Sequence, residues 1–235
     1  VDELLQFAKD VNAGKYDNRT NAVVSLEADL DLTGVEWTPI GCTNDEGDVE
    51  HYFSGKFYGN GHSISNIDYA SMYGKEDIGG LFGFLGGGAE ISGLTLKGNI
   101  DDAGEGYVFL GTLAGYTDGA KISDCISEVV FNNHDKYING TFGLCGYAEN
   151  TVIEYCQNKG NITITNDVSS FYVGGIAGMV MGTSEIRYCS NSGDIKSYAP
   201  QTGGIAGQIS GTAKIINCCS TGKLTPLGKG ITDMG

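Results

Sequence analysis

The chain has 235 residues, and its 29 acidic and 14 basic side chains give a formal net charge of −15. This charge argues against nucleic acid and anionic membranes as partners, because both are bound through clustered Lys and Arg. Its 38 glycines and 3 prolines exclude collagen and a Pro-rich disordered tract. No apolar run approaches the ~18 to 20 residues of a membrane span. The chain also lacks the basic start and following apolar stretch of a signal peptide. Because we expect the abrupt start at Val1 to reflect trimming, the lack of a signal peptide says little about secretion.

Residues 1–13 predict a short amphipathic helix at the start of the chain. Leu4, Ala8 and Val11 fall on one face at helical spacing. Gly14 suits the end of the helix, because glycine readily adopts the left-handed conformation that terminates many helices. No later segment sustains a 3.6-residue period, so the rest of the chain is predicted to be strands and turns.

Two segments then alternate apolar with other residues, which is the period of a strand. Residues 22–32 alternate through Val24 and Leu26, and we expect one continuous strand there. Residues 43–51 follow as a polar, acidic loop. Residues 53–67 alternate again, and we interpret them as a divergent unit that precedes a regular repeat.

A glycine-rich apolar pentad recurs five times, and its closing glycines are 32, 31, 32 and 29 residues apart. The pentads are residues 79–83, 111–115, 142–146, 174–178 and 203–207. Three apolar rows follow the pentads at fixed distances: Ile91, Ile122, Ile153, Ile186 and Ile215; Leu94, Cys125, Cys156, Cys189 and Cys218; and Ile100, Phe131, Ile162, Ile195 and Leu224. A fixed period of about 30 residues is typical of a stacked array, whose units bury their apolar faces against their neighbours.

Each repeat is predicted to supply three short strands separated by corners, so that about 30 residues make one turn of a parallel coil. A further row follows the second apolar row by two residues in the sequence. It should place hydrogen-bonding side chains at one corner of most turns. Its members are Leu96, Ser127, Asn158, Asn191 and Ser220. Irregular insertions should emerge along one edge, at residues 101–107, 132–140, 166–171 and 197–202.

The seven cysteines are predicted to be free thiols. Four of them occupy the second apolar row, where the first repeat has Leu94, and a position that accepts Leu or Cys is typical of a buried apolar site. Neighbouring turns lie about 4.8 Å apart, within disulfide range, but in-register side chains point alongside each other. The chain has no CxxC motif and only 3 histidines, so we expect no zinc site.

The repeat resembles a known family. The pattern GG-[LI]-x-G followed by I-x-x-C-x-N-x-G-x-I is similar to the GLUG-motif repeats of bacterial surface proteins, which include regions of bacterial immunoglobulin A1 peptidase-like proteins. Residues 174–195 match the pattern most closely, and residues 79–100 lack the Cys. The resemblance covers nearly the whole chain, and residues 28–62 resemble the lead-in of such repeats. It implies a right-handed parallel β-helix, part of a larger secreted or surface-anchored protein, and no established chemistry.

The sequence and the resemblance together predict an all-β fold, a right-handed parallel β-helix with a short N-terminal capping α-helix. Residues 1–52 are expected to form the N-terminal cap, residues 53–224 one divergent turn and five GLUG-like repeats, and residues 225–235 a C-terminal tail or linker. The helix is expected to close the solenoid, because an open end exposes apolar core and unpaired strand edges.

We identify no catalytic constellation and expect the chain not to be an enzyme. A zinc peptidase needs the HExxH arrangement, which His51, His62 and His134 do not form. Glycoside hydrolysis needs two facing carboxylates about 5 to 10 Å apart. The dense acidic groups are a loop with Asp45, Glu46, Asp48 and Glu50, and the pair Asp101 and Asp102. We interpret both as solvated loops, with calcium binding in the first as the less favoured alternative, and expect no metal and no cofactor.

Two rows of tyrosines are the candidate binding residues. Tyr155 and Tyr188 share one position just before the cysteine, and Tyr116 and Tyr147 share another just after the pentad. Stacked, outward aromatic rows can hold sugar rings. The competing interpretation, which we favour from the sequence, is that such rows flank and cover the sheet.

These features favour a non-enzymatic bacterial surface or secreted module. It would act as an adhesive or stalk scaffold and contact a host or bacterial glycan or a surface protein. Two alternatives stay open: a carbohydrate-active β-helix domain such as a polysaccharide lyase or glycosidase, and an accessory binding region of a larger surface hydrolase. The expected location is extracellular.

Overall fold

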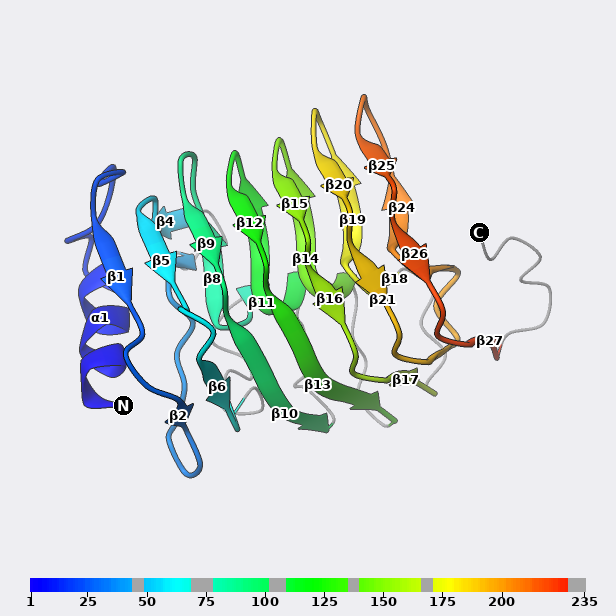
Figure 1. Ribbon diagram of the computed structural model, residues 1–235, viewed down its shortest axis with the longest axis horizontal. Coiled ribbons are helices and arrows are strands. Elements are labelled where there is room, and N and C mark those ends of the chain that lie inside the picture. Colours follow the sequence, from blue (N-terminus) through cyan, green and yellow to red (C-terminus); the bar gives the residue numbers. More distant parts are fainter. Residues whose placement is uncertain (44–48, 69–77, 102–108, 135–139, 166–170, 228–235) are drawn as a thin grey trace.

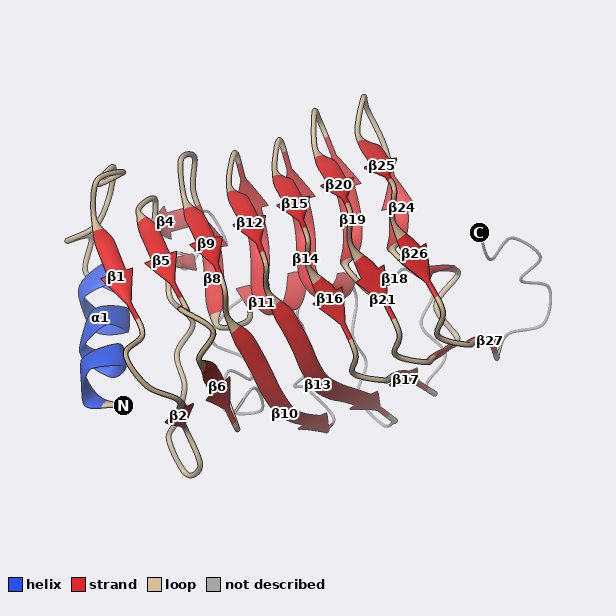
Figure 2. Cartoon of the chain, in the orientation of Figure 1, coloured by secondary structure: helices blue, strands red, loops and turns tan. Residues whose placement is uncertain are grey.

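The computed structural model describes the chain except for residues 44–48, 69–77, 102–108, 135–139, 166–170 and 228–235. The described residues form a solenoid whose turns follow one another along the long axis of the molecule (Figure 1). Strands make up nearly all of its regular structure (Figure 2). Of the predicted insertions, residues 197–202 are described, whereas most of the other three lie outside the described residues.

One helix, α1 (Asp2–Asn12), covers the N-terminal end of the solenoid (Figure 1). Its buried side chains are Leu4, Phe7, Ala8 and Val11. The ring of Phe7 meets Phe53 edge-on, with 5.3 Å between centroids, and lies 6.2 Å from Phe57. The helix therefore shields the apolar side chains of the first turns from water, and the predicted capping helix is confirmed.

The first sheet stacks seven parallel strands, side by side in Figure 1. In order they are β1 (Val23–Ser25), β5 (Lys56–Tyr58), β9 (Glu90–Ser92), β12 (Lys121–Ser123), β15 (Val152–Glu154), β20 (Glu185–Arg187) and β25 (Lys214–Ile216). The middle residue of each strand pairs with its equivalent in the next turn, which makes the inward row Val24, Phe57, Ile91, Ile122, Ile153, Ile186 and Ile215. The predicted first apolar row is confirmed and extends to β1.

The second sheet continues each turn beyond a corner. Its main path is β2 (Leu30–Asp31), β6 (Ser63–Ser65), β10 (Thr95–Asp101), β13 (Ile126–Asn133), β16 (Gln157–Asn158), β21 (Ser190–Asn191) and β26 (Cys219–Ser220). Beside this path lie β17 (Ile162–Ile164), β22 (Ile195–Ser197) and β27 (Leu224–Pro226). The predicted third apolar row is in register from Ile100 to Leu224.

The third sheet carries the glycine-rich pentads. Its strands are β7 (Ile78–Gly79), β8 (Phe82–Leu85), β11 (Phe109–Asp118), β14 (Gly140–Glu149), β18 (Phe171–Gly174), β19 (Ala177–Met181), β23 (Gln201–Gly203) and β24 (Ala206–Ile209). The register shifts within the pentad, as between Gly111 and Ala114. Glycine is needed at this irregularity, because a Cβ on Gly111 would overlap the carbonyl oxygen of Ala114.

The fourth residues of the pentads pair in register beyond the shift, and they are Phe82, Ala114, Cys145, Ala177 and Ala206. The Leu or Ile before each of them is buried in all but the last turn. A separate antiparallel pair, β3 (Cys42–Thr43) and β4 (Val49–His51), lies outside the three long sheets. The parallel pairings within the three long sheets confirm the predicted parallel β-helix.

The prediction of one continuous strand over residues 22–32 is wrong, because the chain turns a corner between β1 and β2. Residue Asp29 shapes this corner, where its carboxylate accepts a 2.7 Å hydrogen bond from the backbone N–H of Ser63. Alternation persists through a corner when both flanking strands face one core, so the period alone did not reveal the break. Since β1 and β2 pair in parallel with β5 and β6, residues 23–31 already contribute to the first two sheets.

Candidate functional site

Each regular turn passes from the first to the second sheet through a residue in the left-handed backbone conformation. These corner residues are Gly93, Asp124, Tyr155, Tyr188 and Asn217, with φ between 51° and 66°. The N–H of Tyr155 donates to the carbonyl of Arg187 in the next turn at 3.2 Å, and the N–H of Tyr188 donates to Ile216 at 3.0 Å. The corner thus keeps its backbone pairing with the next turn.

Tyrosine is a costly choice for this corner. Glycine, asparagine and aspartate tolerate positive φ, whereas for other residues the left-handed region costs about 1–2 kcal/mol each. Burial does not explain the rings, since Tyr155 is 51% exposed and Tyr188 is 48% exposed. Strained backbone conformations of this kind cluster at functional sites.

The two corner tyrosines stack on each other. Their ring centroids are 5.2 Å apart and their planes differ by 8°. Because Tyr155 and Tyr188 occupy the same corner of consecutive turns, the stack runs along the solenoid axis. We call Tyr155 and Tyr188 the corner pair.

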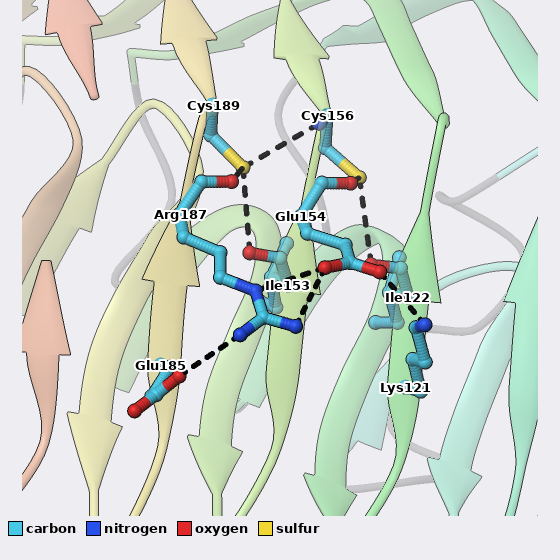
Figure 3. A network of polar contacts seen from close by, with 8 residues as sticks. All are labelled: Lys121, Ile122, Ile153, Glu154, Cys156, Glu185, Arg187 and Cys189. Atoms are coloured by element: carbon cyan, nitrogen blue, oxygen red, sulfur yellow. Dashed lines mark hydrogen bonds and ion pairs between the residues drawn. The ribbon is translucent and has the colours of Figure 1, made fainter. Parts of the chain in front are cut away.

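A network of charged side chains lies on the first sheet next to the corner pair (Figure 3). The carboxylate of Glu154 lies 2.7 Å from the Nζ of Lys121 on one side and 2.8 Å from the Nη2 of Arg187 on the other. Arg187 also contacts Glu185 at 3.3 Å, and Glu185 in turn lies 4.0 Å from Lys214. Positive and negative charges therefore alternate along the solenoid, each balanced by a neighbouring turn.

This network fixes the charge of Glu154, whose side chain is only 11% exposed. The hydrogen bond from Lys121, with help from Arg187 and against the effect of burial, holds the pKa of Glu154 below its usual value of 4.5. Both carboxylate oxygens are occupied by cations. Glu154 is therefore ionised and unsuited to donate a proton as a general acid at neutral pH.

The residue after each corner points into the core and forms the predicted cysteine row. The backbone N–H of Cys156 lies 3.4 Å from the Sγ of Cys189, and the N–H of Cys189 lies at the same distance from Cys218 (Figure 3 shows the first pair). Burial raises the pKa of the Cys156 thiol well above its usual value, which keeps it protonated and unreactive. All seven cysteines are free, as predicted.

The two cysteines of the last turn, Cys218 of this row and its neighbour Cys219, are less covered than the cysteines of the earlier turns. Cys218 is half-buried and Cys219 is exposed, whereas Cys125, Cys156 and Cys189 are buried. The prediction that the aligned cysteines are buried is therefore wrong for Cys218. Its turn is the last that the structure describes, and no further described turn covers it.

The predicted polar row lies within the strands of the second sheet and not at a corner, and its later members form the predicted hydrogen-bond ladder from turn to turn. The amide of Asn158 donates to the Oδ1 of Asn191 at 2.8 Å and to the carbonyl of Gly160 at 2.9 Å. Asn191 donates onward to the hydroxyl of Ser220 at 3.2 Å. Asn158 and Asn191 are buried, so these two amides stabilise the stack and offer no surface for a ligand.

Tyr116 and Tyr147 lie on the third sheet, in β11 and β14, and form a different arrangement. Their centroids are 4.9 Å apart at 65°, Phe84 lies 5.0 Å from Tyr116, and Phe109 stacks on Tyr116 at 5.5 Å. The hydroxyl of Tyr116 donates to Glu149 at 2.9 Å. Burial, together with this hydrogen bond, raises the pKa of Tyr116 well above its usual value. We call Phe84, Phe109, Tyr116 and Tyr147 the aromatic cluster.

The four candidate tyrosines therefore do not form one site. Tyr116 and Tyr147 are half-buried, and neighbouring rings pack against them, so an exposed row open to a ligand is wrong for these two and the favoured interpretation, a row that covers the sheet, fits them. Tyr155 and Tyr188 are exposed at a corner between the other two sheets. The corner pair is the better candidate, because its ring surface is open to a ligand.

The other polar candidates do not assemble into a site among the described residues. Asp45, Glu46, Asp48 and Asp102 lie outside the described residues. Each of the three histidines has a different partner: His51 contacts Asp17 at 2.9 Å, His62 contacts Asp29 at 3.4 Å, and His134 contacts Thr165 at 2.7 Å. In the part of the chain that the structure describes, no three His, Cys, Asp or Glu side chains are grouped as metal ligands.

Sequence reasoning missed the charged network and the strain at the corner. Glu154 and Arg187 share the register position one residue before the corner, so aligning the repeats would have shown opposite charges on consecutive turns. The occupants Gly93, Asp124 and Asn217 were the signal for a left-handed corner, because these residue types favour that conformation.

Comparison with known proteins supports the repeat assignment. Residues 169–196 match the family model of the GLUG motif, which confirms the predicted resemblance to GLUG-repeat proteins. No curated protein sequence matches the chain. A solved structure described as IgA1 Protease is similar over 97% of this chain, with a TM-score of 0.54 and 19% identity. At this identity the likeness concerns the fold alone, and the chain spans 20% of that structure's length.

Among the described residues, no helix has the length and apolar character that a membrane-spanning helix requires.

Proposed function

We propose that this chain, a parallel β-helix with a GLUG motif, is a non-enzymatic extracellular scaffold that presents a regular surface to a ligand. The in-register stacking of equivalent residues carries this proposal. It holds the outer side chains of consecutive turns about 4.8 Å apart on a stiff backbone. Loops and corners on a rigid scaffold are where recognition residues are usually found.

The described charges on the first sheet support binding over catalysis. A glycosidase needs two carboxylates that flank the bond to be cleaved, with one of them protonated. Glu154 and Glu185 lie on the same face of the sheet, and the guanidinium of Arg187 lies between them. The space between these two carboxylates is thus filled by a cation, and neither carboxylate faces the other across an open site.

A second candidate function is an accessory binding region of a larger hydrolase. The likeness in fold to a structure described as IgA1 Protease, of which the chain spans a fifth, favours this candidate. In that case the solenoid would position a partner for chemistry performed elsewhere. Secretion or surface attachment of the parent protein belongs to the same proposal, as does a bacterial origin.

A combined turnover and binding screen tests this proposal. The purified chain is incubated with neutral and acidic polysaccharides, mucin and immunoglobulin, with reducing ends and fragments measured by colorimetry and mass spectrometry. In parallel, a glycan array and immobilised mucin report binding. We expect binding without turnover.

Two variants sharpen the interpretation of the screen. Turnover that disappears in Glu154→Gln or Glu185→Gln would overturn the scaffold proposal in favour of a carbohydrate-active domain. Turnover unaffected by both variants would still contradict it and would direct the search to carboxylates outside the described residues. Binding of intact immunoglobulin without cleavage would support the accessory region over a glycan-binding module.

A further inference from the structure

The corner pair leaves one face of each ring outside the stack. The rings of Tyr155 and Tyr188 cover each other's inner faces, with 5.2 Å between centroids. On the outer side of Tyr155 the equivalent corner of the previous turn is Asp124, and the turn before that has Gly93. Because these side chains are short or absent, neither of the two previous corners places a bulky side chain beside Tyr155, which is 51% exposed. We call this stretch of two turns, ~10 Å long, the shelf.

We propose that this shelf binds an uncharged hexopyranose unit of a glycan, stacked on the ring of Tyr155. This assignment deepens the proposed function and rests on it. The face of an aromatic ring is electron-rich and attracts the weakly positive C–H groups on the flat side of a pyranose. A ~10 Å shelf accommodates one sugar ring in line with the tyrosine stack.

Polar groups beside the shelf match the hydroxyls of a sugar. Asp124 is exposed at the neighbouring corner and accepts hydrogen bonds. Gln157 is exposed two residues beyond Tyr155 in β16 and offers both a donor and an acceptor. Ser123, at the end of β12, adds a half-buried hydroxyl on the other side of the corner. A flat aromatic face with a few polar groups around it is the usual composition of a small-molecule site.

The charges favour a neutral sugar over an acidic one. Arg187 is the cation next to the corner pair, and its guanidinium is already bound by Glu154 and Glu185. The exposed carboxylate of Asp124 would repel a uronate or sialate. The chain as a whole carries a formal charge of −15, which weakens the approach of any anionic glycan.

The backbone supplies an independent argument that the rings themselves matter. Consecutive turns place Tyr155 and Tyr188 at a left-handed position that the same chain fills elsewhere with Gly93, Asp124 and Asn217. Both rings are about half exposed, so their contribution to the core does not account for the choice. Strain retained at an exposed aromatic position points to a ligand.

Isothermal titration calorimetry with neutral hexasaccharides tests the assignment. The probes are cello-, malto- and mannohexaose, with hexagalacturonate as the acidic counterpart. We expect at least one neutral probe to bind. Affinity should fall at least tenfold in Tyr155→Asn/Tyr188→Asn. It should stay within threefold of wild type in Tyr155→Phe/Tyr188→Phe, which keeps both rings. Tyr58→Asn, the same change on the first sheet three turns away, is the control and should leave affinity unchanged.

Several outcomes would overturn the assignment. If the asparagine variant, folded by circular dichroism, binds a neutral probe within twofold of wild type, the site lies elsewhere while the scaffold proposal stands. If hexagalacturonate alone binds, the ligand class is wrong. If no hexasaccharide binds, the glycan assignment falls, and binding of intact protein partners in the broader screen would show that the scaffold proposal survives it.

Discussion

The corner pair and the aromatic cluster each contain tyrosines from two consecutive turns. The two arrangements differ in the backbone conformation of these tyrosines and in how far their rings are exposed. Tyr116 and Tyr147 lie on strands, and their ring planes form an angle of 65°. Two phenylalanine rings pack against Tyr116, and its hydroxyl donates a hydrogen bond to Glu149. Tyr155 and Tyr188 stand on left-handed corners, parallel within 8° and about half exposed. A ring on a strand is covered by its neighbours, whereas a ring on a convex corner has free space beside it.

This difference separates two roles that sequence rows cannot distinguish. Rings in the aromatic cluster bury apolar area against each other and should stabilise the fold. Rings in the corner pair require a backbone conformation that tyrosine disfavours, so they should add little to stability. Stability measurements on matched variants therefore assign a role to each row.

The largest effect is expected in the aromatic cluster. Replacing both rings in Tyr116→Asn/Tyr147→Asn should lower the free energy of unfolding by about 2–4 kcal/mol, because it removes several ring contacts and leaves Glu149 without its phenol partner. Urea denaturation followed by circular dichroism measures this change. A loss below about 0.5 kcal/mol would contradict the covering role of this row.

A smaller effect is expected on the inner side of the corner, directly behind Tyr188. Cys189→Ser should lower the free energy of unfolding by about 1–3 kcal/mol, because it places a hydroxyl in a buried, largely apolar row. The exposed Cys219 provides the control, and Cys219→Ser should change little. Thiol titration of the native protein should label Cys219 first. Mass spectrometric detection of a Cys156–Cys189 bridge would overturn this description of the row.

A pH-dependent effect is expected beside the corner pair. The pKa of Glu154 is held below 4.5, so its ion pairs stabilise the fold above that pH, and the stabilisation is lost as the pH falls through the lowered pKa. Glu154→Gln should cost about 1 kcal/mol near neutral pH, and the difference from wild type should close in acid. Denaturation across a pH series measures it. Glu128→Gln, which breaks the exposed pair with Lys159, is the control and should show almost no cost.

The rows of the solenoid could be predicted from the sequence because each turn repeats the same apolar spacing. Ile91, Ile122 and Ile153 pair in register, as do Phe131 and Ile162, because a one-residue slip would turn a whole row from the core to the solvent. The capping helix was predictable for a similar reason, since its apolar face repeats at helical spacing.

Features set by backbone direction and by neighbouring turns could not be predicted from the period. The corner that splits residues 22–32 keeps the alternation of a strand. It is revealed by contacts with the next turn, such as the hydrogen bond between Asp29 and Ser63, 34 residues apart. The exposure of Tyr155 depends on the left-handed angle of the corner. Spacing alone places Tyr116 and Tyr155 in equivalent kinds of row, although one is covered and the other open.

The unfolding free energy of Tyr155→Asn/Tyr188→Asn, measured beside wild type and Tyr116→Asn/Tyr147→Asn, tests most directly whether the corner pair serves a ligand. Asparagine is the residue that the chain itself uses at the equivalent corner, Asn217, and it tolerates positive φ. We predict a stability within about 0.5 kcal/mol of wild type or higher, since relief of strain offsets the lost stacking. A loss of about 2 kcal/mol or more, equal to that of the aromatic cluster, would show that the corner rings are structural and would contradict their assignment to binding.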